Sequence, residues 1–311
     1  MTHAFFIVGP TASGKSEIAA DVAREVGAEI VSADAFQLYR GFDLLTAKPD
    51  VSTLAKAAHH LIGTVPVTEE MNAEKYRRAA TLATEDINSR GKLAILVGGS
   101  GLYIKAITHG LAPLPESDPA LREKLNAMSL DDLCSQLLEL DAETARKTDL
   151  NNRRRVVRAL EVCLVTGKSA SAQREWTCDA GFPRRGGFQS AVKGVFLLRD
   201  REELYERINQ RVEAMFERGV IEEVRTAGET GRTASQMIGL REIRELLAGK
   251  KSVPQCIAEI QQATRRYAKR QLTWFRRQTN FPPLNLSSLT HKEAVKWISL
   301  RILSEAGTRD D

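Results

Sequence analysis

Short apolar runs alternate with longer amphipathic segments in the first third of the chain. Residues 4–8, 29–33 and 92–97 are apolar runs closed by small or polar residues, which is typical of buried parallel strands. Residues 18–26 carry apolar side chains at helical spacing before a glycine, and residues 73–89 are mostly helix-forming. This alternation predicts a doubly wound α/β fold, a parallel sheet with helices on both faces. Such sheets bind ligands at the carboxyl ends of their strands.

The pattern becomes helical after a proline-rich stretch near residue 115. Residues 119–175 predict helices throughout, a loop follows over 181–187, and residues 192–198 are again an apolar run typical of a strand. We therefore predict a helical insertion domain over 115–190.

The sheet domain would then consist of residues 1–114 and 191–311. Its second segment predicts an amphipathic helix from Leu204 to Phe216 and a last long helix over 254–278. We expect the tail after about residue 304 to be frayed.

The residues between the first strand and the first helix carry the most specific motif. The sequence GPTASGKS at 9–16 fits G-x-x-x-x-G-K-[ST], the phosphate-binding P-loop. Backbone N–H groups at the helix N-terminus would face a phosphate. Lys15 would add a positive charge, and Ser16 offers an oxygen to Mg²⁺. The motif predicts a P-loop NTPase-like fold that binds a phosphorylated ligand.

Acidic residues at the ends of strands limit which reactions this P-loop could support. A P-loop ATPase needs an acid at the end of a strand, and the run over 93–99 ends without one. Asp34 instead ends the second strand, where it could support Mg²⁺, act as a general base or cap a helix. The residues alone leave these alternatives open. The segment 46–49 (TAKP) is weak evidence, and the pair His59–His60 indicates packing or capping more than metal binding.

Charge is unevenly distributed along the 311 residues, although the net charge is only +5. Residues 1–150 contain 15 Lys and Arg against 21 Asp and Glu, whereas residues 151–311 contain 30 against 19. Basic residues gather at 153–158 and 265–277, the second with interleaved aromatic residues. Charge alone leaves open a polyanionic partner such as RNA or a set of solvated helix faces.

Other features favour a cytoplasmic chain. The four cysteines are scattered without a C-x-x-C pair, which argues against a zinc site or a disulfide framework. We find no secretory signal and no apolar stretch long enough to span a membrane, so we expect no membrane partner.

In their order along the chain, the motifs resemble those of tRNA dimethylallyltransferases, also called tRNA isopentenyltransferases, over about residues 4–280. The matching segments are GPTASGKS at 9–16, DAFQLY at 34–39, TAKP at 46–49, HHLI at 59–62, GGSGLY at 98–103, RxxRALEV at 155–162, TGKS at 166–169, LYxRIxxRV at 204–212 and YAKRQxTWFR at 267–276. Single segments other than the P-loop are weak, but their joint order is highly specific.

The resemblance implies transfer of a dimethylallyl group from dimethylallyl diphosphate to N6 of the adenosine 3′ of a tRNA anticodon, position 37. The P-loop would hold the diphosphate leaving group, with no nucleotide required. The implied catalytic residues are Asp34, Lys15 and Thr11. The implied diphosphate-binding residues are Gly9, Thr11, Ala12, Ser13, Gly14, Lys15, Ser16 and Arg225. Ser16 would hold the cofactor Mg²⁺.

The resemblance also implies contacts with the anticodon stem-loop. The residues expected to contact tRNA are Asp34, Ala35, Phe36, Gln37, Ser100, Arg122, Arg158, Ala159, Leu160, Glu161, Val162, Gln236, Arg241, Lys269, Arg270 and Arg276. Nothing in the family pattern demands a protein partner, so we expect a monomer.

The chain departs from the family pattern at a few positions. Ala35 replaces the usual serine, Ser100 the usual threonine, and Leu240 a frequent aromatic residue, while Leu44–Leu45 replace a common Ile-Gly. None removes a group that the chemistry needs. Three other functions remain: an isopentenyltransferase acting on free AMP, a small-molecule kinase, and a non-enzymatic RNA-binding protein. The basic segments argue against the first.

Overall fold

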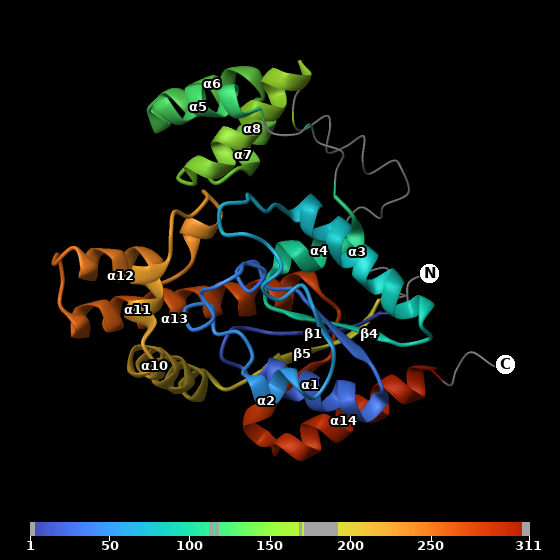
Figure 1. The fold of residues 1–311 in the computed structure, drawn as a ribbon. Coiled ribbons are helices and arrows are strands. Elements are labelled where there is room, and N and C mark those ends of the chain that lie inside the picture. The colour runs from blue at the N-terminus through green and yellow to red at the C-terminus, as the bar shows by residue number, and fades with distance from the viewer. Residues whose placement is uncertain (1–3, 112–114, 116–117, 168–169, 171–191, 307–311) are drawn as a thin grey trace. The chain divides into compact units, whose positions relative to one another are not determined.

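The computed structural model describes residues 4–111, 115, 118–167, 170 and 192–306. The chain divides into two compact units, residues 1–108 with 187–311 and residues 109–186 (Figure 1). The second unit overlaps the helical insertion predicted over 115–190. The loop predicted over 181–187 and the tail after residue 306 lie outside the described residues.

The first unit is built on a six-stranded parallel sheet in the order β3-β2-β4-β1-β5-β6. The strands are β1 (Ala4–Val8), β2 (Glu29–Ser32), β3 (His59–His60), β4 (Ala94–Gly98), β5 (Lys193–Leu198) and β6 (Pro283–Asn285). The chain leaves β1 toward β2 on one side and later adds β5 on the other side. The carboxyl end of β1 is therefore the switch point where such sheets bind ligands. The predicted α/β fold is confirmed.

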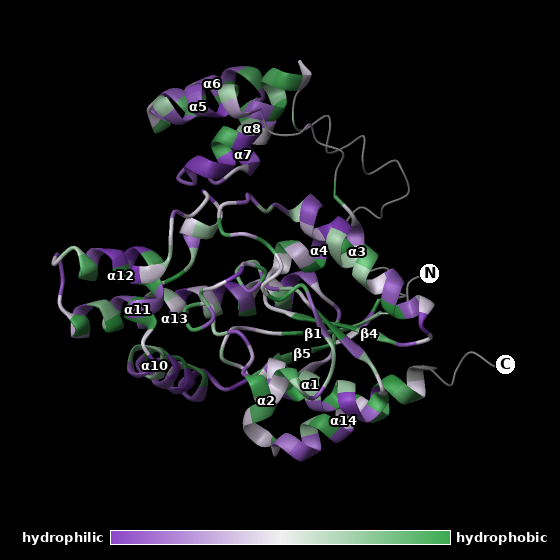
Figure 2. Cartoon of the chain, in the orientation of Figure 1, coloured by the Kyte–Doolittle hydropathy of each residue, from purple (hydrophilic) through white to green (hydrophobic). Residues whose placement is uncertain are grey.

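Helices cover both faces of the sheet, as Figure 1 shows. Phe5 and Ile7 of β1 belong to one hydrophobic cluster, whose helices are α1 (Lys15–Val26) and α14 (His291–Ala306). Phe6 and Val8 belong to the other, which contains α3 (Ala73–Ser89), α4 (Gly101–His109) and α13 (Val253–Gln278). Alternate side chains of a strand point to opposite faces, and Figure 2 shows the strands as apolar between helices with hydrophilic outer sides.

Local signals explain the helices that the sequence predicted well. Gly14 and Gly27 flank α1, both with positive φ, so each supplies a left-handed conformation that other residues rarely adopt. Asn72 caps α3 by accepting from the Lys75 N–H, and Ser252 caps α13 in the same way from Gln255. The predicted helix over 73–89 is confirmed at both ends.

Several short elements were not predicted, and the expectation that 254–278 is the last helix is wrong. The helix α14 follows it, packing Val295, Ile298 and Ile302 against α1 and the sheet. Trp297, Leu300 and Leu303 are apolar but exposed, so α14 has no clear amphipathic pattern along its sequence. The other short helices are α2 (Val51–Leu54), α11 (Val220–Thr226) and α12 (Leu240–Leu247), beside the predicted α10 (Arg201–Glu217).

Residues 119–166 form four helices, as the helical pattern over 119–175 predicted, whereas residues 171–175 lie outside the described residues. They are α5 (Pro119–Ala127), α6 (Leu130–Leu140), α7 (Ala142–Lys147) and α8 (Arg153–Thr166). Asp118, Ser129, Asp141 and Asn152 each accept a backbone N–H at a helix start. These four caps, spaced through the segment, divide it into short helices.

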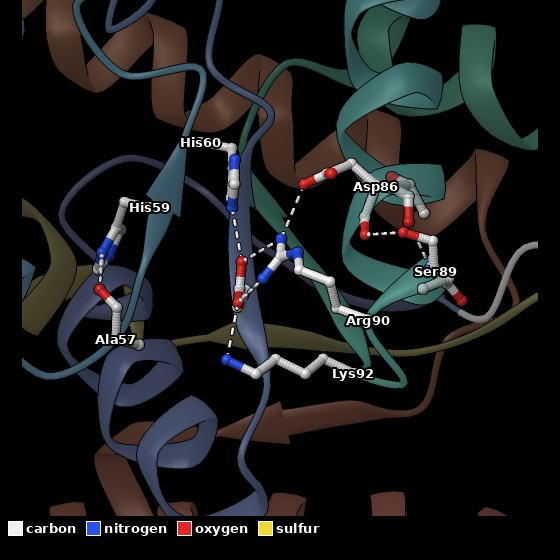
Figure 3. A network of polar contacts seen from close by, with 10 residues as sticks. Ala57, His59, His60, Asp86, Ser89, Arg90 and Lys92 are labelled. Atoms are coloured by element: carbon white, nitrogen blue, oxygen red, sulfur yellow. Dashed lines mark hydrogen bonds and ion pairs between the residues drawn. The ribbon is translucent and has the colours of Figure 1, made fainter.

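A polar network at the amino ends of the strands explains the pair His59–His60 (Figure 3). The carboxylate of Glu29 is buried and accepts from Arg90, from Lys92 Nζ at 2.9 Å and from His60 Nε2 at 2.8 Å. The hydrogen bond from Arg90 holds the pKa of Glu29 well below its usual range, against the effect of burial. His59 contacts the Ala57 carbonyl oxygen. Both histidines thus make polar contacts within the fold, at the amino ends of the strands and away from the P-loop.

Within the described residues, no helix combines the length and apolarity needed to cross a membrane.

Candidate functional site

The P-loop wraps around the carboxyl end of β1 and leads directly into α1. Ala12 and Gly14 have positive φ values of 63° and 91°, which turn successive peptide groups toward one side of the loop. The first N–H groups of α1 have no intrahelical acceptor because a helix cannot satisfy its own first turn. Those of Lys15 and Ser16 are therefore available to an anion.

Basic side chains hold the carbonyl oxygens of this loop. Arg207 Nε donates to the Ala12 carbonyl at 2.9 Å, and Arg199 Nε donates to the Ser13 carbonyl at 2.9 Å. Lys15 Nζ donates to a third carbonyl of the loop at 3.1 Å. Side chains thus hold the carbonyl groups of the loop, and the amide groups of Lys15 and Ser16 remain available to an anion.

Arg211 lies closest to the predicted catalytic groups. Its Nη1 donates to the Thr11 hydroxyl at 2.9 Å, and its Nη2 lies 3.4 Å from the Thr46 carbonyl oxygen. Burial lowers the pKa of Arg211 to about 10, although the charge of Asp34 opposes this shift. Burial likewise lowers the pKa of Lys15 to about 8, with Asp34 opposing and Arg211 reinforcing the effect. The site is therefore poorly hydrated and carries more positive than negative charge. Both properties favour binding of an anion.

The role of these arginines was not predicted from the sequence. Arg207 and Arg211 lie in the segment LYxRIxxRV at 204–212, four residues apart on α10. That spacing places both side chains on one helix face. The available signal for a role in the site was this pair of arginines on the polar side of a helix. Arg199 directly follows the carboxyl end of β5.

A cavity of about 320 Å³ opens beside the loop. Its polar lining includes Thr11, Lys15, Ser16, Asp34, Gln37, Asp50, Arg207 and Arg211. Its apolar lining includes Leu45, Val212, Met215, Phe216, Val220, Met237, Ile238, Ile243 and Ile260. One cavity thus joins a basic phosphate-binding loop, a carboxylate and an apolar wall.

The segment after Asp34 forms a turn that is fixed on several sides. Asp34 Oδ1 accepts from the N–H groups of Phe36 at 3.0 Å and Gln37 at 3.4 Å, so the aspartate caps a turn, not a helix. The Ser100 hydroxyl accepts from the Ala35 N–H at 2.9 Å. Gln37 Nε2 donates to the Ala47 carbonyl at 3.0 Å. These bonds position Asp34 in the cavity without occupying both of its oxygens.

The TAKP segment lies against this turn and forms a further part of the cavity wall. Lys48 is largely buried, and its ammonium group donates to the carbonyl oxygens of Tyr39 and Gly41 and to the Asp43 carboxylate. Ala47 has a φ of 45°, a conformation that is strained for a residue with a side chain. Lys48 lines the cavity, but its ammonium group is bonded within the segment and stabilises this strained wall.

Three residues assigned to the diphosphate lie away from the cavity lining. A Cβ on Gly9 would lie 2.5 Å from the Leu197 carbonyl oxygen, so this glycine permits packing of β1 on β5. Ser13 is fully buried beneath the loop. Arg225, on α11, is exposed and paired with Glu222. Its side chain does not line the cavity, and Arg211 lines the cavity beside Thr11.

Paired substitutions test this correction. Arg211→Ala should weaken binding of inorganic diphosphate about 10-fold to 100-fold, because it removes a charged donor from the loop. Arg225→Ala removes an exposed ion pair and should leave the affinity unchanged within twofold. Calorimetric titration of both variants measures the difference, and the reverse order of effects would restore Arg225 to the site.

The pKa of Lys15 also predicts a pH dependence. Only the protonated ammonium attracts an anion, so diphosphate affinity should be full below about pH 8 and fall above it. Lys15→Arg keeps its charge through this range and serves as the control, since the ionisation of diphosphate itself affects both proteins alike. Identical pH profiles for the two proteins would show that Lys15 does not contact the anion.

The residues of the second unit that were expected to contact tRNA are mostly buried. Ala159 and Leu160 lie in the core that α8 shares with α5 and α6, and Val162 packs on Cys163. Glu161 is completely buried and pairs with Arg122 and Arg158, with Arg158 Nη1 at 2.6 Å. The expectation of tRNA contacts is corrected for Ala159, Leu160, Glu161 and Val162, because their side chains stabilise the unit internally.

Arg122 and Arg158 remain partly exposed while bound to Glu161. In the first unit, Gln236, Arg241, Lys269, Arg270 and Arg276 are exposed. Arg241 pairs with Glu242, and Arg270 stacks on the Tyr267 ring at 5.7 Å. Lys269, Arg276 and Arg277 form no ion pair with the described residues, so α13 presents an uncompensated basic surface.

Ser16 is the predicted metal ligand, and its fit can be judged from the donors around it. Ser16 lines the cavity together with Asp34, so a hydroxyl and a carboxylate oxygen are both accessible. No cluster of three His, Cys, Asp or Glu side chains suited to a metal occurs among the described residues. These residues fit a hard cation that brings further oxygen ligands on a bound phosphate, as Mg²⁺ does.

Comparisons with known proteins agree with the motifs. A family model described as IPP transferase matches residues 37–278. The tRNA dimethylallyltransferase 1 of Citrifermentans bemidjiense is 42% identical over 276 residues, 88% of each chain. The tRNA dimethylallyltransferase of Akkermansia muciniphila is 39% identical over 303 residues, 97% of this chain and 99% of that one.

A solved structure gives the same result for the fold. The full-length tRNA isopentenylpyrophosphate transferase of Bacillus halodurans aligns with a TM-score of 0.70 and 31% identity, covering 98% of this chain and 96% of that chain. The resemblance found in the sequence is thereby confirmed, and the chain belongs to the IPP transferase family.

Proposed function

We propose that this protein transfers the dimethylallyl group of dimethylallyl diphosphate to N6 of the adenosine at position 37 of tRNA. The relatives named above are tRNA dimethylallyltransferases. The observation that carries the proposal is the composition of one cavity, where Lys15 and Arg211 lie beside Asp34 and an apolar wall. A site for a prenyl diphosphate needs basic groups at one end for the diphosphate and an apolar wall at the other end for the prenyl group. The attacking amine also needs a proton acceptor nearby.

The donor fits the two ends of this cavity. Its diphosphate would bind the amide groups at the start of α1, together with Lys15, Arg207 and Arg211. Thr11 and Gly14 form the same loop and place these donors. The five-carbon tail would contact the apolar wall that includes Leu45 and Val212. Binding of the anion would offset the excess positive charge of the empty loop.

The reaction requires one bond to break as another forms. The bond between C1 of the dimethylallyl group and the diphosphate oxygen breaks, and its electron pair stays on the diphosphate. Lys15 and Arg211 stabilise that developing charge in a site of low hydration. The N6 nitrogen bonds to C1, and Asp34 accepts the N6 proton as this bond forms. The products are N6-dimethylallyladenosine in tRNA and diphosphate.

Ser16 would hold Mg²⁺ together with oxygens of the diphosphate, and Asp34, which lines the same cavity, would add a nearby negative charge. When bound, the cation neutralises charge on the departing diphosphate. Removal of divalent cations with a chelator should therefore slow transfer, while the basic residues of the loop retain part of the binding.

The acceptor must reach the cavity as an unstacked base. Adenosine 37 lies in a single-stranded loop, which lowers the cost of moving the base out of its stack. The exposed basic residues of α13 are suited to the phosphates of the anticodon stem, and Gln37 to the base and its neighbours. Arg122 and Arg158 of the helical insertion would add further phosphate contacts. We also propose that the protein acts as a monomer in the cytoplasm, where tRNA occurs.

A direct assay tests the acceptor. Incubation with dimethylallyl diphosphate and either tRNA or AMP, followed by nucleoside mass spectrometry, should yield prenylated adenosine only from tRNA. Prenylated AMP would indicate the enzyme that acts on the free nucleotide. Binding of tRNA without any transfer would favour a non-enzymatic RNA-binding protein.

A further inference from the structure

A buried glutamine of α13 connects the P-loop to the turn that holds the Asp34 segment. Gln271 is 5% exposed, although it belongs to the helix that carries the exposed basic residues. Its Oε1 accepts from the Thr11 N–H at 2.9 Å, and its Nε2 donates to the Gly99 carbonyl at 2.9 Å. Gln271 is not among the site residues that the sequence predicted.

The position of Gln271 follows from how parallel strands end. The backbone hydrogen bond from Gly9 N–H to the Gly98 carbonyl, at 3.3 Å, continues the pairing of β1 and β4 past Val8. Beyond this bond the ladder ends, and the Thr11 N–H and the Gly99 carbonyl make no backbone hydrogen bond to each other. The amide side chain of Gln271 supplies an acceptor to one and a donor to the other, as a peptide group would.

The glycines of the turn at 98–101 confirm that α13 packs directly on it. A Cβ on Gly99 would lie 2.2 Å from Gln271 Nε2, and a Cβ on Gly101 would lie 2.4 Å from the Trp274 ring. The family resemblance assigned Ser100 of this turn to contacts with tRNA. The geometry shows that Gly99 and Gly101 make room for helix α13.

The same helix face also reaches the acceptor side of the cavity. The hydroxyl of Tyr267, one turn before Gln271, faces the Ser100 side chain. Ser100 in turn accepts from the N–H of Ala35, next to Asp34. Side chains four residues apart on α13 thus fix the loop expected to bind the leaving group and the turn that carries the expected base.

We propose that Gln271 is a positioning residue for the transfer reaction, which holds the diphosphate loop at Thr11 in register with the turn at Gly99. It touches neither substrate. The bond to the Thr11 N–H fixes the first peptide group of the loop, and Arg211 binds the hydroxyl of the same residue. Loss of the glutamine amide frees the start of the loop to rotate, so its amide groups no longer converge on the diphosphate.

The test uses Gln271→Met, which keeps the side-chain length and removes both hydrogen bonds. The matched control is Gln262→Met, an exposed position on the same helix. Calorimetric titration with inorganic diphosphate, in the absence of tRNA, should show affinity lowered about tenfold for Gln271→Met and unchanged for the control. The KM for dimethylallyl diphosphate should rise in parallel, while tRNA affinity stays within twofold.

A merely structural role predicts a different result. A lower thermal midpoint with equal losses of diphosphate and tRNA affinity would overturn the proposal, as would unchanged diphosphate affinity in a folded variant. The inference rests on the proposed function only through the binding of diphosphate. If the wild-type protein binds diphosphate and transfers no prenyl group, the proposed function fails and the effect of Gln271→Met on binding still decides this proposal.

A second variant, Gln271→Glu, gives an independent measurement. Its carboxylate can accept from Thr11 but can donate to Gly99 only when protonated. Relative to the wild type at each pH, its diphosphate affinity should therefore improve as pH is lowered through the range where this carboxyl gains a proton. A constant ratio of the two affinities across that range would contradict the hydrogen-bonding role of Gln271.

Discussion

Asp34→Asn should lower the rate of prenyl transfer by about 100-fold or more, the usual scale for loss of a general base. The asparagine side chain keeps an oxygen in the position of Oδ1, so it can still accept from the N–H groups of Phe36 and Gln37. The turn is retained and only the proton acceptor is lost. Single-turnover rates with tRNA and dimethylallyl diphosphate measure the effect, and both substrates should bind within a few-fold of the wild type.

The matched control is Asp50→Asn. Asp50 lines the same cavity and also bonds to backbone, since it caps the short helix α2 by accepting from the Thr53 N–H at 2.8 Å. Its substitution removes one negative charge from the cavity without touching the acceptor turn, and transfer should stay within about threefold of the wild type. Near-normal transfer by Asp34→Asn, or equal losses in both variants, would exclude Asp34 as the specific base.

Removal of the exposed charges of α13 should have the second large effect. The triple variant Lys269→Gln, Arg276→Gln and Arg277→Gln should lower tRNA affinity about 100-fold at low salt. Each phosphate contact contributes about 0.7–0.9 to the slope of log affinity against log salt concentration, so the slope should become shallower by about 2 to 3. Binding isotherms at several salt concentrations measure both quantities. These side chains form no ion pairs with the described residues, so the fold should be unaffected.

A control with equal charge loss lies on the other face of the sheet. Arg24, Lys292 and Lys296 are exposed on α1 and α14, and their replacement by glutamine removes the same number of charges. If α13 is the tRNA surface, this control should keep the wild-type salt slope. Equal flattening by both triple variants would show that tRNA responds to net charge rather than to the surface of α13.

Local sequence patterns predicted most of the strands, loops and helices that position the site. The P-loop, β1 and α1 are neighbours in sequence, and their glycines and apolar runs specify them without reference to the rest of the chain. Asp34 was predicted correctly to line the cavity because it follows a parallel strand, and the ends of such strands converge. The helix at 73–89 was predicted to its last residue because a cap and an apolar face agree.

Contacts between distant segments could not be predicted in the same way. The bond between Arg211 and Thr11 joins residues 200 positions apart, and that of Gln271 to Thr11 joins residues 260 apart. The four-residue spacing of Arg207 and Arg211 indicates a shared helix face, but no local pattern shows which distant segment that face contacts. The segment 158–162 shows the opposite error. It matched the family motif as a block, yet Leu160 is buried in the core and only Arg158 keeps an exposed face.

The central claim is that the P-loop holds a diphosphate leaving group and not a nucleotide whose phosphoryl group is transferred. The most direct measurement is product analysis after incubation with tRNA and either dimethylallyl diphosphate or ATP. We expect one inorganic diphosphate released per prenylated adenosine from the first donor, and neither orthophosphate nor modified tRNA from the second. Orthophosphate or a phosphorylated product from ATP, with tRNA left unprenylated by dimethylallyl diphosphate, would contradict the account and indicate a kinase or an ATPase.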